Sequence, residues 1–176
     1  MKSSREIKQQ PIEVEYERIV FEESGGVLEL PKLENYGQNK QEYKENVAIY
    51  QLLAKHGEQY RILPVRHPPK DVIPQKGEYS SPDALNLRTG QYSDAKSPHS
   101  QNAKSAIQRG YKDASKKGCG EVVFKLLPEY SEASIWNANK SALGRGRNRS
   151  IKKVILIDPD ERVKIYDADQ IRKLLK

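Results

Sequence analysis

The spacing of hydrophobic and polar residues divides this chain into strand-like and helix-like segments. Alternating apolar and acidic residues over 12–30, interrupted by the turn residues Ser24-Gly25-Gly26, predict an acidic β-hairpin. Apolar residues at helical spacing predict helices over 41–56 and 103–117. A nearly continuous apolar run over 121–127 is typical of a strand in the interior of a mixed sheet.

Shorter segments complete the prediction, and all of them fit one domain over residues 1–176. Within it, we expect a loose N-terminal segment and the acidic hairpin in 1–40, a central core in 42–127 and closing elements in 128–176. The remaining elements are a strand at 60–65, a loop rich in Pro, Gly and Lys at 66–80, a loop at 128–134, a short helix at 135–143, strands at 154–157 and 162–166, and a terminal helix at 169–176.

The stretch from Ser81 to Lys96 predicts two short strands joined by a turn at Arg88-Thr89-Gly90. Residues two apart on a strand share a face, so Asp94 and Lys96 point the same way and Asp83 can lie across from Asp94. Two carboxylates suit a hard divalent cation such as Mg²⁺, which prefers oxygen ligands. An adjacent ammonium can orient a water molecule or neutralise charge that develops on a phosphate.

Composition narrows the class of protein further. The formal net charge of +7 favours an anionic partner, with nucleic acid as the usual candidate. A single cysteine, Cys119, excludes an internal disulfide and a cysteine zinc cluster. The chain has no run of about 18 apolar residues and no apolar segment after its first residues, so we expect neither a membrane span nor a secretory signal.

Positive charge gathers in two stretches that we expect to contact phosphate. One is the polar face of the helix over 103–117, and the other is a flexible run from 144 to 153 in which arginines alternate with small residues. Guanidinium groups on such a run can bind backbone phosphates bidentately, although an ordinary solvated surface is the alternative for both stretches. The candidate nucleic-acid-binding residues are Lys104, Arg109, Arg145, Arg147, Arg149 and Lys152.

The motif Pro82-Asp83, followed after ten residues by Asp94-Ala95-Lys96, resembles the signature of the PD-(D/E)xK nuclease superfamily. The predicted order of helix, three strands, helix and strand over 42–127 is also the order of that superfamily's core. The segments 44–57 and 60–65, together with the closing strand near 154, resemble the C-terminal toxin nucleases of CdiA-type contact-dependent inhibition proteins and their phage-borne relatives.

This resemblance implies an α/β (α+β) fold with a restriction-endonuclease-like αβββαβ core, an N-terminal hairpin and a C-terminal strand pair with a helix. It implies catalysis by Asp83, Asp94 and Lys96, a third acidic ligand at Glu45, and Gln108 near the metal. Mg²⁺ is the expected cofactor, with Mn²⁺ or Zn²⁺ as alternatives. Asp94 departs from the Glu that is common in the toxin group, which leaves the metal geometry open.

The function that follows is a metal-dependent endonuclease acting on DNA or on RNA such as tRNA, and the motif does not distinguish these substrates. The resemblance further implies a cognate immunity protein, delivery as the C-terminal part of a larger secreted or phage-encoded protein, and action in the cytoplasm. The alternative is a non-catalytic nucleic-acid-binding or scaffold module on the same fold.

Overall fold

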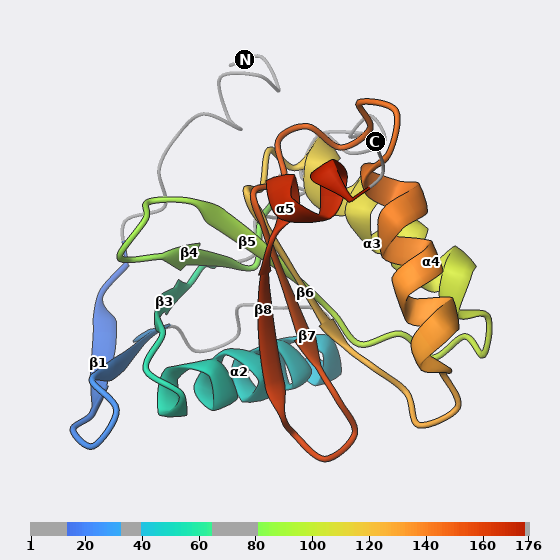
Figure 1. The fold of residues 1–176 in the computed structure, drawn as a ribbon. Coiled ribbons are helices and arrows are strands. Elements are labelled where there is room, and N and C mark those ends of the chain that lie inside the picture. Colours follow the sequence, from blue (N-terminus) through green and yellow to red (C-terminus); the bar gives the residue numbers. More distant parts are fainter. Residues whose placement is uncertain (1–13, 33–39, 65–80, 175–176) are drawn as a thin grey trace, which may run out of the picture.

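A computed structural model describes residues 14–32, 40–64 and 81–174. Its centre is a mixed eight-stranded sheet in which the strands lie in their order along the chain (Figure 1). The strands are β1 (Tyr16–Phe21), β2 (Gly26–Pro31), β3 (Gln59–Ile62), β4 (Ala84–Asn86), β5 (Tyr92–Lys96), β6 (Glu121–Lys125), β7 (Lys153–Ile157) and β8 (Val163–Asp167). The helices are α2 (Lys40–Lys55), α3 (Ala103–Lys116), α4 (Glu132–Leu143) and α5 (Ala168–Lys173).

Helices cover both faces of this sheet (Figure 1). Helix α2 packs on one face, where Tyr50 and Leu53 are fully buried against Val123 of β6. Helices α3, α4 and α5 enclose the core on the other face, which includes Ile107 and Phe124. Because full burial of one such side chain contributes about 1.5–3 kcal/mol, these two apolar layers hold the sheet between its helices.

The central prediction is confirmed, because α2, β3, β4, β5, α3 and β6 follow one another as helix, three strands, helix and strand. Strands β3, β4 and β5 pair antiparallel, and β5, β6 and β7 are parallel. The acidic hairpin is confirmed from Tyr16 onward, with β1 antiparallel to β2. The start of the predicted hairpin, at 12–13, and the predicted loop over 66–80 lie outside the described residues.

The C-terminal half differs from the prediction at its helix starts. Helix α4 begins at Glu132 and not at Ile135, because the Ser131 hydroxyl accepts a hydrogen bond from the Ser134 N–H and caps the helix. Helix α5 begins at Ala168 with Asp167 as its cap. Within the described ranges, no helix is long and apolar enough to cross a membrane.

Helix α3 approaches the sheet closely at Gly110. A Cβ atom placed on this glycine would lie 2.8 Å from Cζ of Phe124, closer still to Cε1 of that ring, and 3.2 Å from Cγ of Lys96. Only a residue without a side chain fits this contact, and it brings the second half of α3 over β5 and β6. The predicted catalytic strand is therefore covered by a helix held at short range.

Candidate active site

The hairpin of β4 and β5 brings Asp83 beside Asp94. Its turn is fixed by Asn86, whose Oδ1 accepts hydrogen bonds from the N–H groups of Arg88 and Thr89. Strand β4 then pairs with β5, and Asp83 Oδ2 accepts a hydrogen bond of 2.8 Å from the Ala95 N–H. This hydrogen bond holds Asp83 against β5, the strand that carries Asp94 and Lys96.

Two lysines converge on the carboxylate of Asp94, which is 0% exposed. The Lys96 ammonium lies 3.1 Å from Oδ2, and the Lys117 ammonium lies 3.0 Å from Oδ1. Lys96 also lies 3.4 Å from Oδ2 of Asp113 on α3. The predicted common orientation of Asp94 and Lys96 is confirmed, and α3 adds two charged groups to the site.

The environment separates the pKa values of the two carboxyl groups. Burial, and then the charge of Asp94, raise the pKa of Asp83 to about 8. Burial acts in the same direction on Asp94, but the ammonium groups of Lys96 and Lys117 outweigh it and hold the pKa of Asp94 below its usual range. The two opposite shifts favour a proton on Asp83 and an ionised Asp94.

The donor set fits a divalent cation held by two carboxylates. Carboxylate oxygens are the ligands that Mg²⁺ prefers, and this ion usually takes one or two of them together with water and substrate phosphate. Oδ2 of Asp94 is buried and has no hydrogen-bond partner among the described residues, although the Lys96 ammonium lies 3.1 Å away. Among the described residues, no group of three or more His, Cys, Asp or Glu side chains could hold a metal ion. The fit therefore rests on the Asp83–Asp94 pair.

The other two predicted catalytic residues make contacts away from this pair. Glu45 lies on α2 and accepts a hydrogen bond from the Gln41 side chain. The Gln108 amide on α3 donates a 2.9 Å hydrogen bond to the Ser141 hydroxyl on α4. The metal role of Glu45 and the catalytic role of Gln108 stay predictions that these contacts do not support.

The basic run after α4 adopts defined turns, in contrast to the flexible run expected from its sequence. Arg145 and Asn148 have positive φ angles of 53° and 51°. The Asn148 side chain donates to the Ala142 carbonyl, and Arg172 of α5 donates to the Asn148 carbonyl. Gly146 and Asn148 adopt the left-handed conformation readily, whereas Arg145 does so as a long side chain, and all three arginines of the run are exposed.

The predicted nucleic-acid-binding residues are exposed on α3 and on the segment between α4 and β7. Lys104 and Arg109 are exposed on α3, and Lys152 is exposed just before β7. Arg145 and Arg147 form no ion pair within the described part of the chain, whereas Arg149 donates to the Gly146 carbonyl. The run is also joined to the end of α3, because the hydroxyls of Ser115 and Ser150 lie 3.4 Å apart.

Lys117 and Asp113 were not among the residues predicted for the site. They are four residues apart at the end of α3, so they lie on the same face of the helix. This face also carries Gly110, with Asp113 one turn and Lys117 two turns after it. Gly110 is the one sequence signal that could have pointed to them, because glycine allows a helix to approach a strand closely. From sequence, Lys117 is assigned instead to the solvated basic face of the helix.

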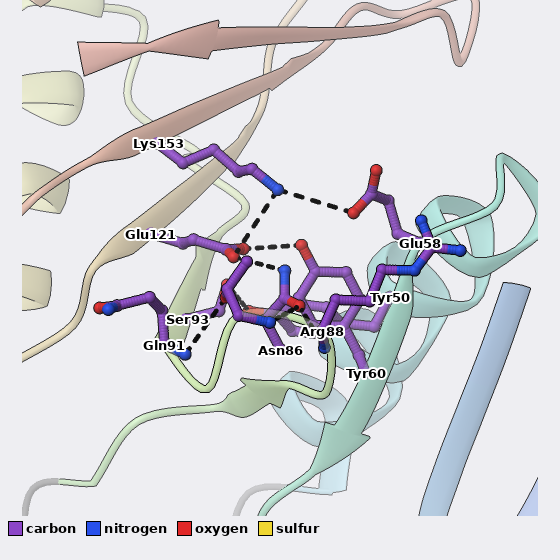
Figure 2. A network of polar contacts seen from close by, with 10 residues as sticks. Tyr50, Glu58, Tyr60, Asn86, Arg88, Gln91, Ser93, Glu121 and Lys153 are labelled. Carbon is purple, nitrogen blue, oxygen red and sulfur yellow. Dashed lines mark hydrogen bonds and ion pairs between the residues drawn. The ribbon is translucent and has the colours of Figure 1, made fainter. Parts of the chain in front are cut away.

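A second polar cluster lies buried on the α2 face of the sheet (Figure 2). Oε1 of Glu121 accepts a 2.7 Å hydrogen bond from the Tyr60 hydroxyl, and Oε2 accepts one of 2.6 Å from the Asn86 amide. The Lys153 ammonium lies 3.9 Å from Glu121 and 3.6 Å from Glu58. Burial raises the pKa of Glu121, although these donors oppose the shift. The cluster ties β3, β4, β6 and β7 together and keeps Asn86 in place for the turn.

Comparison with known proteins adds one structural neighbour. No protein-family model matches the chain, and no curated protein does. The fold is similar to that of a chain in the CdiA-CT/CdiI toxin and immunity complex from Burkholderia pseudomallei, with a TM-score of 0.52 and 19% sequence identity. The likeness covers 80% of this chain and 98% of that chain. It shows a shared fold, and the mixed sheet with helices on both faces confirms the predicted fold class.

Proposed function

We propose that this chain is a metal-dependent nuclease that hydrolyses phosphodiester bonds in DNA or RNA. The observation that carries the proposal is the buried contact of Asp94 with Lys96, beside Asp83, which directly precedes the neighbouring strand β4. A carboxylate pair with an ammonium at 3.1 Å is a donor set for phosphate chemistry at a divalent cation.

Each residue has a role that follows from its position. Asp83 and Asp94 would hold the cation, which when bound supplies polarisation of a phosphoryl oxygen and activation of water. Lys96 donates hydrogen bonds where negative charge grows on the phosphate, and its ion pair with Asp113 holds the ammonium in place. Lys117 balances the charge of Asp94, so the buried carboxylate stays ionised.

Binding of a polyanion is supported by the surface around the end of α3. Lys117 reaches Asp94 from this end, and Ser115 two residues earlier contacts Ser150 of the basic run. Arg145 and Arg147 lie on the same run and form no ion pair with any described residue. A nucleic-acid backbone that contacts these arginines would therefore lie against a run that contacts α3, the helix whose end reaches the carboxylate pair.

We further propose that the nuclease is a toxin-type effector domain. The proposal is supported by the fold that it shares with a chain of a toxin and immunity complex. Such a domain would be delivered as the C-terminal part of a larger secreted or phage-encoded protein and would act in the cytoplasm. It would require a cognate immunity protein in the cell that carries it.

The alternative function is nucleic-acid binding without catalysis. It is favoured by one observation, since both oxygens of Asp94 already face an ammonium group and no third acidic ligand stands near among the described residues. A binder would keep this cluster as a structural ion network.

Cleavage assays separate the two functions. The purified chain is incubated with plasmid DNA and with total tRNA in Mg²⁺, Mn²⁺, Zn²⁺ or EDTA, beside Asp94→Asn and Lys96→Met. Lys164→Met on exposed β8 is the matched lysine control. Metal-dependent cleavage that both site variants abolish and the control retains supports the nuclease. Salt-sensitive binding with no cleavage of either substrate refutes it and leaves the binder.

A further inference from the structure

Two hollows adjoin along α4, and Ser141 lines both of them. One is cationic and has a volume of about 480 Å³. The other has a volume of about 460 Å³ and is lined by amides and hydroxyls. We infer that together they hold one unpaired nucleotide of a nucleic acid, with its phosphate in the cationic hollow and its base in the polar hollow.

The cationic hollow is suited to a phosphate group. Its charged lining residues in the described part of the chain are Lys140, Arg145 and Arg147, and no described acidic residue lines it. None of the three forms an ion pair with an acidic side chain in the described ranges. Unpaired cations around one hollow attract a dianion or a backbone phosphate, and guanidinium groups bind it bidentately.

The polar hollow is suited to an uncharged base. Its described lining includes one cation, Lys104, and one anion, Glu129, so these two charges balance. The side-chain amides of Gln101 and Asn137 line it and form no hydrogen bond within the described part of the chain. An amide offers both donors and acceptors, which is the pattern that base edges require.

The division of charge between the hollows matches the division within a nucleotide, which has an anionic phosphate and a neutral base. The wall between them is preformed, because the Gln108 amide bonds to Ser141 and fixes α3 against α4. A paired base has its Watson–Crick edge occupied, whereas an unpaired base presents that edge to side chains. The inference of an unpaired nucleotide as ligand rests on the proposed nuclease function. It narrows the substrate of that nuclease to nucleic acid with unpaired nucleotides.

Fluorescence anisotropy in EDTA tests this inference with three labelled probes of one sequence: single-stranded RNA, single-stranded DNA and a blunt RNA duplex. A denaturing gel verifies that the probes stay intact. The variants are Asn137→Ala in the polar hollow and Arg145→Gln in the cationic hollow. The matched controls are Gln51→Ala on the exposed face of α2 and Arg162→Gln before β8.

We expect Asn137→Ala to weaken binding of a single-stranded probe about tenfold, the effect of one lost hydrogen-bonding pair, and to leave duplex binding nearly unchanged. Arg145→Gln should weaken binding of all probes and reduce the slope of log affinity against log salt by about one. Both controls should match the wild type. The RNA and DNA probes show which backbone the hollows prefer.

Equal loss of single-stranded and duplex binding in Asn137→Ala, or no loss of either, overturns the inference. The cleavage assay is scored separately. A chain that cleaves but shows no strand-dependent loss keeps the nuclease function without this subsite. A chain that does not cleave but shows the strand-dependent loss keeps the subsite without the nuclease function.

Discussion

Gly110→Ala tests whether α3 lies as close to β5 and β6 as the structure has it. The added Cβ would stand 2.8 Å from Cζ of Phe124, where ordinary contacts exceed 3.4 Å. Phe124 is fully buried, so its ring has no free space to enter. Overpacking of this kind costs up to about 3 kcal/mol, and the better helix propensity of alanine returns about 1 kcal/mol. The expected net loss of stability is about 2 kcal/mol.

Urea denaturation followed by circular dichroism measures this loss, which corresponds to a fall in Tm of about 4–8 °C for a domain of this size. Ser105→Ala on the exposed side of α3 is the matched control, because it changes helix propensity without any contact to the sheet. If Gly110→Ala raises stability by about 1 kcal/mol, as propensity alone predicts, the close approach of α3 is refuted.

Three further predictions concern the charged groups. Lys117→Gln removes one of the two ammonium groups at buried Asp94. We expect the free energy of unfolding, measured by urea denaturation, to fall by about 1–2 kcal/mol, less than for an isolated buried pair because Lys96 still faces the carboxylate. An unchanged urea midpoint would contradict the contact. Burial raises the pKa of Glu121, so its native carboxyl binds a proton more tightly than the unfolded chain does, and its contribution to stability is present at low pH and lost as pH rises through the folded pKa. Glu121→Gln should remove this fall in stability with rising pH. If the stability of the wild type and of the variant changes in parallel between pH 4 and pH 8, the raised pKa of Glu121 is refuted. Burial and the charge of Asp94 raise the pKa of Asp83 to about 8. Mg²⁺ binding should therefore release a proton and become tighter as the pH rises toward 8, and calorimetry in two buffers of different ionisation enthalpy measures the released proton. Binding that is independent of pH and buffer would refute a metal site shared by Asp83 and Asp94.

The sequence was sufficient to predict the arrangement of Asp83, Asp94 and Lys96, because it depends on residues close together in the chain. Alternation along β5 alone determines that Asp94 and Lys96 share a face, and the short turn at Arg88-Thr89-Gly90 sets the register that places Asp83 opposite. The same holds for α3, whose apolar spacing is a property of nearby residues in the chain. These predictions needed no knowledge of tertiary packing.

The contacts that sequence reasoning missed join residues far apart in the chain. Lys117 meets Asp94 across 23 residues, and Tyr60 meets Glu121 across 61 residues. From sequence, Glu121 reads as the polar start of an apolar strand, because its hydrogen-bond donors lie on strands whose neighbours are fixed only by the folded sheet. The turns after α4 were missed for a similar reason, since Arg172 of α5 holds their carbonyls.

Helix α3 connects the proposed chemistry to the proposed binding surface. Asp113 and Lys117 on its sheet-facing side contact Lys96 and Asp94 of β5. Gln108 bonds to α4 at the wall between the two hollows, and Ser115 contacts the basic run. These contacts lie within three turns of one helix, which moves as a unit. Displacement of α3 by Gly110→Ala should therefore lower cleavage and single-strand binding together, whereas Asn137→Ala changes binding and leaves the Asp94–Lys96 contact intact. Loss of cleavage without loss of binding in Gly110→Ala would mean that the two surfaces are not coupled through α3.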